Sequence, residues 1–334
     1  MRGHTSGQIY TFSMIERLCS PEPEYETNKV ERKPMTIDTQ NTNWKPDLCI
    51  HHFPCDDGFA AAWVVWKKWG DDVSFHGMTY GEELPDVSGK NVLFVDFSVN
   101  LDVMEQLAEK AKSIVILDHH KTAKAALAPL CTPDYYMPFT YQTVRRTASE
   151  VRDCNTTDWF VIAQFDDGAC GARLAWHFCF PDEEVPDFIR YIEDRDLWHM
   201  SMKGTRRFSL GLRSYSYSFP VWERLSKKTE MLIDEGKIIE RFYDKKVREV
   251  CKGATYQIIA GHLVLVANAP HFMASDVAHE LLKQDTDMAF AACYYDTKHV
   301  RTYSLCSEDD RQDVSEIAKQ YGGGGHRNAA GFSR

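Results

Sequence analysis

Three short apolar runs in the first half of the chain each end in acidic residues or histidines. The runs lie at 47–53, 91–95 and 114–117, and helical patterns at 59–66 and 101–112 separate them. The later two runs are apolar at successive positions rather than at every second one, which is typical of buried strands in a parallel sheet. Strands that alternate with helices in this way predict βαβ units and an α/β fold.

The side chains at the ends of these runs are potential metal ligands. Asp96 follows the second run directly, and Asp118, His119 and His120 follow the third. The turn after the first run adds five candidates, namely His51, His52, Cys55, Asp56 and Asp57. A capping Asp before a helix would explain one of these five and not all of them. Right-handed crossovers bring the ends of parallel strands to one edge of the sheet, so the pattern predicts a metal site there.

The second half of the chain alternates again, behind a long helical pattern. Strands are predicted at 256–260, 263–268, 287–295 and 300–306, with helices at 275–283 and 314–321. The long pattern, which Gly236 weakens, predicts a connector between two domains. The expected organisation is an irregular extension at 1–45, a metal-binding domain at 46–220, a connector helix at 221–252 and a second domain at 253–334.

The composition limits which partners the protein is expected to bind and in which cellular compartment it is expected to lie. The net charge of −10 disfavours a surface that attracts long nucleic acid, so a polyanionic substrate has to be held by metal ions or a few basic groups. The 10 cysteines form no CxxC pair, which indicates free thiols and a reducing compartment. The cytoplasm is therefore expected, with import into an organelle left open. No apolar run reaches the roughly 18 residues of a membrane helix, so no membrane partner is expected.

With these residues assembled, the chain resembles the DHH phosphoesterase superfamily, over about residues 47–332. Asp118-His119-His120 alone is a weak signal, but a glycine-rich motif at 322–331, ending in Ala-Ala-Gly, follows in the right order. This pair of motifs resembles the members that carry a C-terminal DHHA1 domain, such as nanoRNases, RecJ-like exonucleases and cyclic-dinucleotide phosphodiesterases. The resemblance implies a parallel-sheet domain joined by a long helix to a smaller mixed-sheet α/β domain.

The resemblance also implies roles for the metal-site residues. The expected ligands of two divalent cations are His51, Cys55, Asp57, Asp96, His119 and Asp196. Spacing favours His51 and leaves His52 open, and Asp196 is favoured over Asp194. Asp96 would bridge the ions, while Asp118 orients the cluster and His120 faces the phosphate as the catalytic pair. Cys55 stands where most members have Asp, and a thiolate prefers softer ions such as Zn²⁺ or Fe²⁺.

The second domain is expected to hold the substrate. The resemblance assigns this role to Gly323, Gly324, Gly325, His326, Arg327 and Asn328. Many relatives carry Ser-Leu-Arg-Ser on the preceding strand, whereas this chain has Cys306 in place of the Arg. The change either weakens phosphate binding or moves it to Arg301 or Arg213.

The expected activity is two-metal hydrolysis of a phosphodiester in short oligonucleotides or dinucleotides. Mn²⁺ is the first expectation for the cofactor, with Mg²⁺, Fe²⁺ and Zn²⁺ left open. One alternative is a phosphatase of the 3′-phosphoadenosine 5′-phosphate type, or a polyphosphatase. Another, motivated by Cys55 and Cys306, is a binding or structural protein that kept the fold with weakened catalysis. The expected partner is a short nucleic acid or nucleotide, and a homodimer stays open.

Overall fold

The structure is a computed structural model that describes residues 43–130, 139–142, 144, 161–297 and 300–334. The chain divides into two compact units, Met1–Thr39 and Gln40–Arg334, and all described residues belong to the second. Most of the extension predicted at 1–45 therefore lies outside the described residues. Its last part, 43–45, is irregular, and the buried Trp44 donates from its indole Nε1 to Ser113 Oγ at 2.9 Å.

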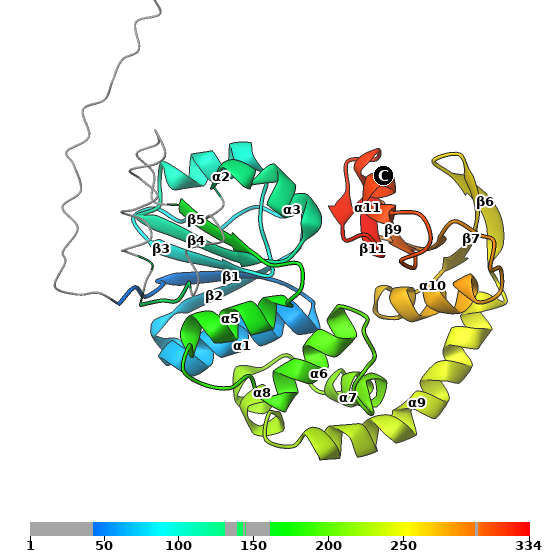
Figure 1. Ribbon diagram of the computed structural model, residues 1–334, viewed down its shortest axis with the longest axis horizontal. Coiled ribbons are helices and arrows are strands. Elements are labelled where there is room, and N and C mark those ends of the chain that lie inside the picture. The colour runs from blue at the N-terminus through cyan, green and yellow to red at the C-terminus, as the bar shows by residue number, and fades with distance from the viewer. Residues whose placement is uncertain (1–42, 131–138, 143, 145–160, 298–299) are drawn as a thin grey trace, which may run out of the picture. The chain divides into compact units, whose positions relative to one another are not determined.

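A five-stranded parallel sheet forms the first domain (Figure 1). Its strands are β1 (Leu48–His52), β2 (Ser74–Met78), β3 (Asn91–Val95), β4 (Ser113–Asp118) and β5 (Val161–Phe165), in the order β2-β1-β3-β4-β5. Strand β2 lies on one side of β1, whereas β3 and the later strands lie on the other side, so the strand order reverses between β1 and β3. Open α/β sheets bind ligands at such a switch point, beyond the carboxyl ends of the strands.

Helices cover both faces of this sheet, which explains why its strands are apolar throughout. Helices α1 (Asp56–Trp69) and α5 (Gly171–Cys179) lie on one face, whereas α2 (Leu101–Ala108) and α3 (Lys121–Ala126) lie on the other (Figure 1). Successive residues of a strand alternate between the two faces. On β3, for example, Leu93 packs in the core beneath α1 and α5, while Phe94 packs in the core beneath α2.

The connector predicted as one helix at 221–252 is two helices, so that prediction is wrong. Helix α6 (Asp187–Asp196) is followed by α7 (Thr205–Leu212), α8 (Phe219–Leu225) and α9 (Thr229–Cys251). The break at 226–228 has a physical reason, because Trp222, Leu225 and Leu232 all pack into the core of the first sheet. A turn between α8 and α9 lets both helices present their apolar residues to that one core.

Helices α7 and α9 contact each other backbone to backbone. A Cβ atom on Gly236 would lie 1.8 Å from the carbonyl oxygen of Arg207, and one on Gly211 would lie 2.1 Å from that of Leu232. Real Cβ atoms do not approach so closely, so both positions require glycine. Gly236, which looks like a weak point of a helix in the sequence, is the residue that allows this contact.

The second domain contains a mixed six-stranded sheet. Its strands are β6 (Thr255–Ile259), β7 (His262–Asn268), β8 (Ala291–Asp296), β9 (Arg301–Cys306), β10 (Gly324–Gly325) and β11 (Ala329–Ser333), in the order β10-β11-β9-β8-β7-β6. Only β7 and β8 pair in parallel among these described strands. Helices α10 (Ala274–Leu282) and α11 (Val314–Lys319) complete the domain. The predicted fold class, a parallel-sheet domain and a mixed-sheet α/β domain, is confirmed.

Short 3₁₀ helices occur at Gly70–Asp72, Ala128–Leu130 and His271–Met273. Within the described part of the chain, no helix combines the length and apolar character that would be needed to cross a bilayer.

Candidate active site

The start of α1, the end of β4 and the end of α6 bring a first group of potential metal ligands together. Asp57, His119 and Asp196 place one ligand atom each within 4.8 Å of one another. His119 Nε2 lies 3.5 Å from Asp57 Oδ2 and 3.7 Å from Asp196 Oδ2. Burial raises the pKa of Asp57, and the charges of Asp96 and Asp196 raise it further. A cation placed among these carboxylates would relieve both effects.

A second group contains His52, Cys55 and Asp96, again with one ligand atom each within 4.8 Å of one another. The structure therefore brings His52 to this group. His51 is buried, and its ring lies edge-on to Phe53 and Phe59 at 6.0 Å. Its Nδ1 lies 3.0 Å from the carbonyl oxygen of His52, and burial lowers its pKa to about 4.

Asp96 links the two groups. Its Oδ1 lies 3.0 Å from His119 Nε2, and its Oδ2 lies 3.7 Å from His52 Nδ1. Oδ2 is buried and has no hydrogen-bond partner among the described residues. A buried carboxylate oxygen without a partner is costly, so this atom fits a cation that bridges to it. The backbone of Asp96 has φ of 52°, an uncommon left-handed conformation that Asp tolerates and that directs its side chain at the end of β3.

The start of α5 holds the metal-site carboxylates in place. Asp57 accepts hydrogen bonds from the backbone N–H groups of Gly171 at 2.6 Å and Ala172 at 2.8 Å, as a helix N-terminus favours. A Cβ atom on Gly171 would lie 2.6 Å from the Cβ of Asp96, so the position requires glycine. Sequence reasoning missed Gly171, because its role depends on contacts with Asp57 and Asp96, which are distant in the sequence.

The two acidic candidates at the end of α6 differ in their contacts. Asp196 faces the first metal group, as described above. Asp194 is buried and accepts hydrogen bonds from the N–H of Ser201 at 2.9 Å, from its hydroxyl at 2.6 Å and from the hydroxyl of Thr205. These bonds hold the turn between α6 and α7, and they lower the pKa of Asp194 although burial acts in the opposite direction.

Asp118 orients the histidine pair of the motif. Its Oδ1 accepts hydrogen bonds from the N–H of His119 at 2.7 Å and from Nδ1 of His120 at 2.7 Å. Its Oδ2 accepts from the hydroxyl of Ser98, a residue that sequence reasoning did not assign although it follows Asp96 by two positions. Burial opposes a charge on His120, but the Asp118 carboxylate outweighs it and raises the pKa of this histidine.

The glycine-rich motif lies against the metal-binding domain at α3. A Cβ atom on Gly324 would lie 2.8 Å from Thr122 Oγ1, and the N–H of Gly325 donates to that same oxygen at 3.2 Å. Gly323 meets the chain of the neighbouring strand, because its Cβ would lie 2.0 Å from the carbonyl oxygen of Gly331. The three glycines thus allow close packing on two sides and place His326 at the metal site.

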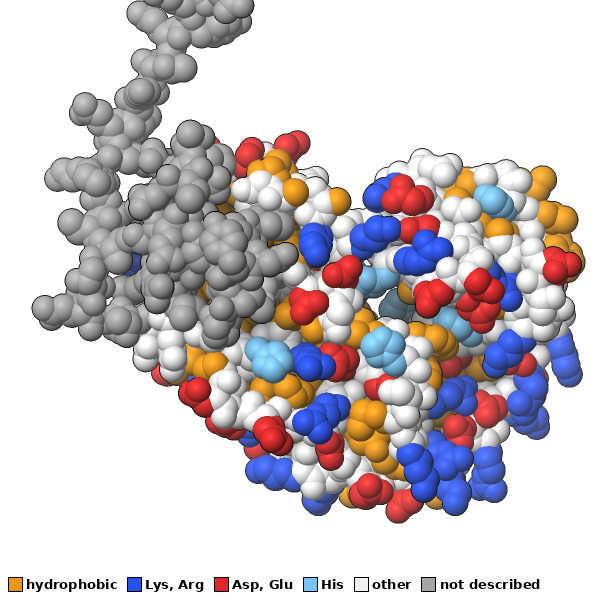
Figure 2. Space-filling model, in the orientation of Figure 1, with side chains coloured by type: hydrophobic (Ala, Val, Ile, Leu, Met, Phe, Trp, Pro, Cys, Tyr) orange, Lys and Arg blue, Asp and Glu red, His pale blue; other side chains and the backbone are white. Residues whose placement is uncertain are grey.

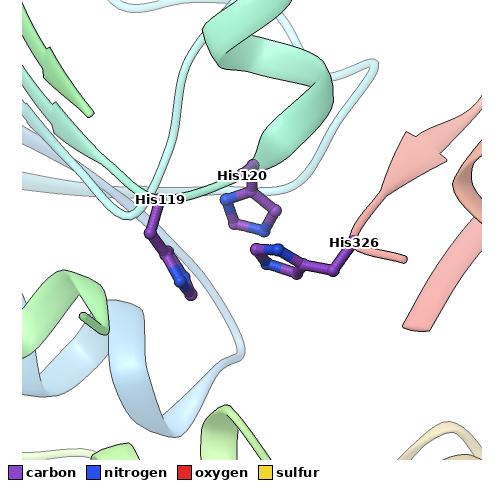
Figure 3. A group of neighbouring side chains, drawn as sticks. All are labelled: His119, His120 and His326. Carbon is purple, nitrogen blue, oxygen red and sulfur yellow. The ribbon is translucent and has the colours of Figure 1, made fainter. Parts of the chain in front are cut away.

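His326 projects from the second domain towards His119 and His120 (Figure 3). Its ring centroid lies 4.7 Å from that of each of the two histidines. Ring nitrogens of all three lie within 4.8 Å of one another. Burial and the charges of His120 and His119 lower the pKa of His326 to about 3.

Arg327 and Asn328 contact the segment before α11. Arg327 donates to the carbonyl oxygens of Asp309 at 2.9 Å and Arg311 at 3.1 Å. Asn328 donates from Nδ2 to Asp309 Oδ1 at 2.6 Å, while its own Oδ1 is buried without a described hydrogen-bond partner. Both residues line the cleft, so their contacts shape its wall.

A cleft of about 730 Å³ connects the two domains. Cys55, Asp57 and Asp196 line it from the first domain, and His326 and Asn328 line it from the second. Figure 2 shows histidines together with lysine or arginine and acidic side chains around the hollow between the two domains. This size suits one small ligand of a few tens of atoms.

Two curated proteins and a solved structure are similar to the chain, whereas no family model matches it. An uncharacterized protein R106 of Acanthamoeba polyphaga mimivirus is 28% identical over 312 residues, which are 86% of this chain and 67% of that protein. Oligoribonuclease NrnB of Bacillus subtilis is 24% identical over 315 residues, 83% of this chain and 70% of that protein. The structure of RecJ from Thermus thermophilus in complex with Mn²⁺ has a TM-score of 0.41 and 13% identity, and the match covers 86% of this chain and 49% of that one.

The parallel sheet and the similarity to oligoribonuclease NrnB agree with the resemblance to the DHH phosphoesterase superfamily. The clustered carboxylates and histidines are suited to binding divalent metal.

Proposed function

We propose that the chain hydrolyses phosphodiester bonds in short oligonucleotides or dinucleotides with the help of two divalent cations. The observation that carries this proposal is the position of Asp96. One of its oxygens faces the group of Asp57, His119 and Asp196, and the other faces the group of His52 and Cys55. A carboxylate that reaches two ligand sets is the arrangement that a pair of ions requires.

The ligands decide which ions fit. The first group offers two carboxylates, one imidazole and the shared Asp96, all of them ligands that suit Mn²⁺. The second group replaces a carboxylate by the Cys55 thiol, so its ion is expected to be bound more weakly when it is Mn²⁺ or Mg²⁺. Two ions of this kind activate a water and stabilise the charge that develops on the phosphate.

His120 is the residue best placed to handle a proton. Because its Nδ1 donates to Asp118, a protonated His120 carries its second proton on Nε2. The Asp118 carboxylate raises the pKa of His120 against the effect of burial, which favours the protonated ring. His120 therefore neutralises charge on the phosphate or protonates the leaving oxygen, while Asp118 holds its ring in position.

The closure of the cleft supports a short substrate. On one side, Lys121 Nζ pairs with Asp313 Oδ2 at 2.7 Å, next to the contact of Thr122 with Gly325. On the other side, Arg195 Nη2 pairs with Asp276 Oδ2 at 2.8 Å. A long duplex would have to break these contacts, whereas a dinucleotide fits within about 730 Å³.

The test is a substrate panel with Mn²⁺: di- to pentanucleotides, cyclic dinucleotides, adenosine 3′,5′-bisphosphate and polyphosphate, with products resolved by size. The expected result is conversion of the shortest oligonucleotides to mononucleotides. Release of inorganic phosphate from the bisphosphate alone would favour the phosphatase alternative. Binding without turnover on every substrate would contradict the proposal and leave a binding protein.

A further inference from the structure

Arg195 lines the cleft and has a buried donor without a hydrogen-bond partner among the described residues. The other cleft cations in the described residues have partners: Lys121 pairs with Asp313, Arg213 Nε with Asp56 at 2.5 Å, and Arg327 with two carbonyl oxygens. Arg195 is only 8% exposed, and its Nη1 is buried without a hydrogen-bond partner among the described residues. A buried guanidinium donor without an acceptor is costly, so the site is incomplete without an additional acceptor.

The surroundings fix the plane of this guanidinium. Its Nη2 donates to Asp276, which also accepts from Arg206 Nε at 3.3 Å and from the hydroxyl of Tyr243 at 3.1 Å. The guanidinium carbon lies 4.1 Å from the centre of the Trp198 ring. With one edge and one face of the guanidinium used in this way, Nη1 is the donor left for a ligand.

The backbone of Trp198 adds an independent sign that this arrangement has a role. Its φ is 58°, a left-handed conformation that a bulky residue rarely adopts. The indole is stacked on His279 with ring centroids 3.8 Å apart and planes at 19°. Strain of this kind persists where surrounding contacts enforce it, which is common at ligand-binding sites. Here those contacts hold the indole against Arg195.

Arg195 also lies near the position where the expected arginine is missing. Burial and the Asp276 carboxylate raise the pKa of the Cys306 thiol to about 12, and the nearby charge of Arg195 acts against this rise. Cys306 and Arg195 line the same cleft. Of the two replacements considered from the sequence, Arg301 is paired with Asp296 and Arg213 with Asp56.

We propose that Arg195 is the anion anchor of the cleft, and that its Nη1 binds a phosphate of the substrate other than the one being hydrolysed. The inference rests on the proposed function for the nature of the substrate. The phosphate contact that the resemblance assigned to an arginine of the second domain would then come from α6 of the metal-binding domain. The ligand class is therefore a dinucleotide that carries an additional terminal phosphate.

The test compares affinities for ApA, pApA and ApAp in EDTA, so that binding is measured without turnover. The wild type is expected to bind one of the two phosphorylated dinucleotides at least tenfold more tightly than ApA, since a hydrogen bond to a charged group is worth roughly that ratio or more. Arg195→Met should lose most of this preference. Arg190→Met is the matched control, because Arg190 is an exposed residue of the same helix, paired with Asp187, and should keep the preference.

Two outcomes would overturn the anchor: a wild type without the preference, or a folded Arg195→Met variant that retains it. If this variant shows no melting transition, Arg195→Lys decides, because lysine can pair with Asp276 but lacks the second donor of the planar fork. Hydrolysis of ApA, pApA and ApAp with Mn²⁺ by the wild type is measured in parallel. Absence of hydrolysis with the phosphate preference intact would refute the proposed function and not the anchor.

Discussion

His326 stacks on His120 across the domain boundary, with ring centroids 4.7 Å apart and planes at 26° (Figure 3). The glycine-rich motif therefore reaches the residue for which we propose the proton-transfer role. Through this contact the second domain places one side chain beside the histidine pair of the first domain.

His326→Ala should lower turnover of short oligonucleotides by about one to two orders of magnitude, because a hydrogen bond to a charged phosphate is worth about 1.5–3 kcal/mol. The loss on a small chromogenic phosphodiester should be at least tenfold smaller. His177→Ala, at an exposed position of α5, is the control. Equal losses on both substrates would mean that His326 serves the metal centre or the fold.

Asp96→Ala should cost the protein both ions, since it removes the carboxylate that faces both ligand groups. Metal content measured after dialysis against Mn²⁺ would fall to the level of the metal-stripped protein. Asp102→Ala changes an exposed acidic residue of α2 and should retain wild-type content. Near-stoichiometric metal in the Asp96 variant would contradict the bridging role.

His52→Ala and His51→Ala should separate metal binding from stability. The first should lower metal content by about one ion per chain, because His52 faces Cys55 and Asp96. The second should leave the metal content closer to normal but lower the free energy of unfolding by about 1–3 kcal/mol, as loss of a buried side chain does. Metal analysis and urea denaturation of both variants check this, and the reverse pattern would restore His51 as the ligand.

Cys55→Asp should raise activity with Mn²⁺ or Mg²⁺, because it replaces a thiol whose pKa is raised by burial and nearby carboxylates with a hard oxygen ligand. Rates are compared with Mn²⁺, Mg²⁺ and Zn²⁺ at equal free concentrations. Lower rates with every hard ion would show that this site is adapted to the sulfur.

Gly236→Ala should destabilise the fold by about 1–3 kcal/mol or more, because its Cβ would overlap a carbonyl oxygen of α7. Gly253→Ala is the matched control, since its Cβ would lie an ordinary 3.5 Å from the carbonyl oxygen of Val250. Urea denaturation should show a lower midpoint for the first variant only. An equally small decrease of the midpoint in both variants would mean that α7 and α9 can move apart without a loss of stability.

The strands of the first sheet and the residues at their ends could be predicted because both signals are local. An apolar run followed by Asp96, or by Asp118 and two histidines, is visible within ten residues. Helix α7 escaped prediction because its eight residues are short and contain Gly211, whose role depends on a partner helix. The break before α9 was not predicted either, because it depends on packing into a core whose other residues are distant in the sequence.

The choice between neighbouring candidates could not be made from spacing. His51 and His52 are consecutive on a strand, so their side chains point to opposite sides, and the sheet decides which one meets Asp96. Gly171 and Ser98 act through contacts with residues that are close only in the fold. Arg195 stands between Asp194 and Asp196 in the sequence, and only its buried donor without a described partner sets it apart.

The backbone contact between α7 and α9 restricts how the cleft can open. With Gly211 and Gly236 in contact with the opposing chain, the first half of α9 cannot slide along α7 and has to move with it. Arg206 and Arg207 of α7 also pair with Asp244 and Glu240 of α9, so an opening of the cleft is expected to bend the chain beyond Asp244. Entry of a substrate and release of its products would then be governed by the stiffness of this single segment.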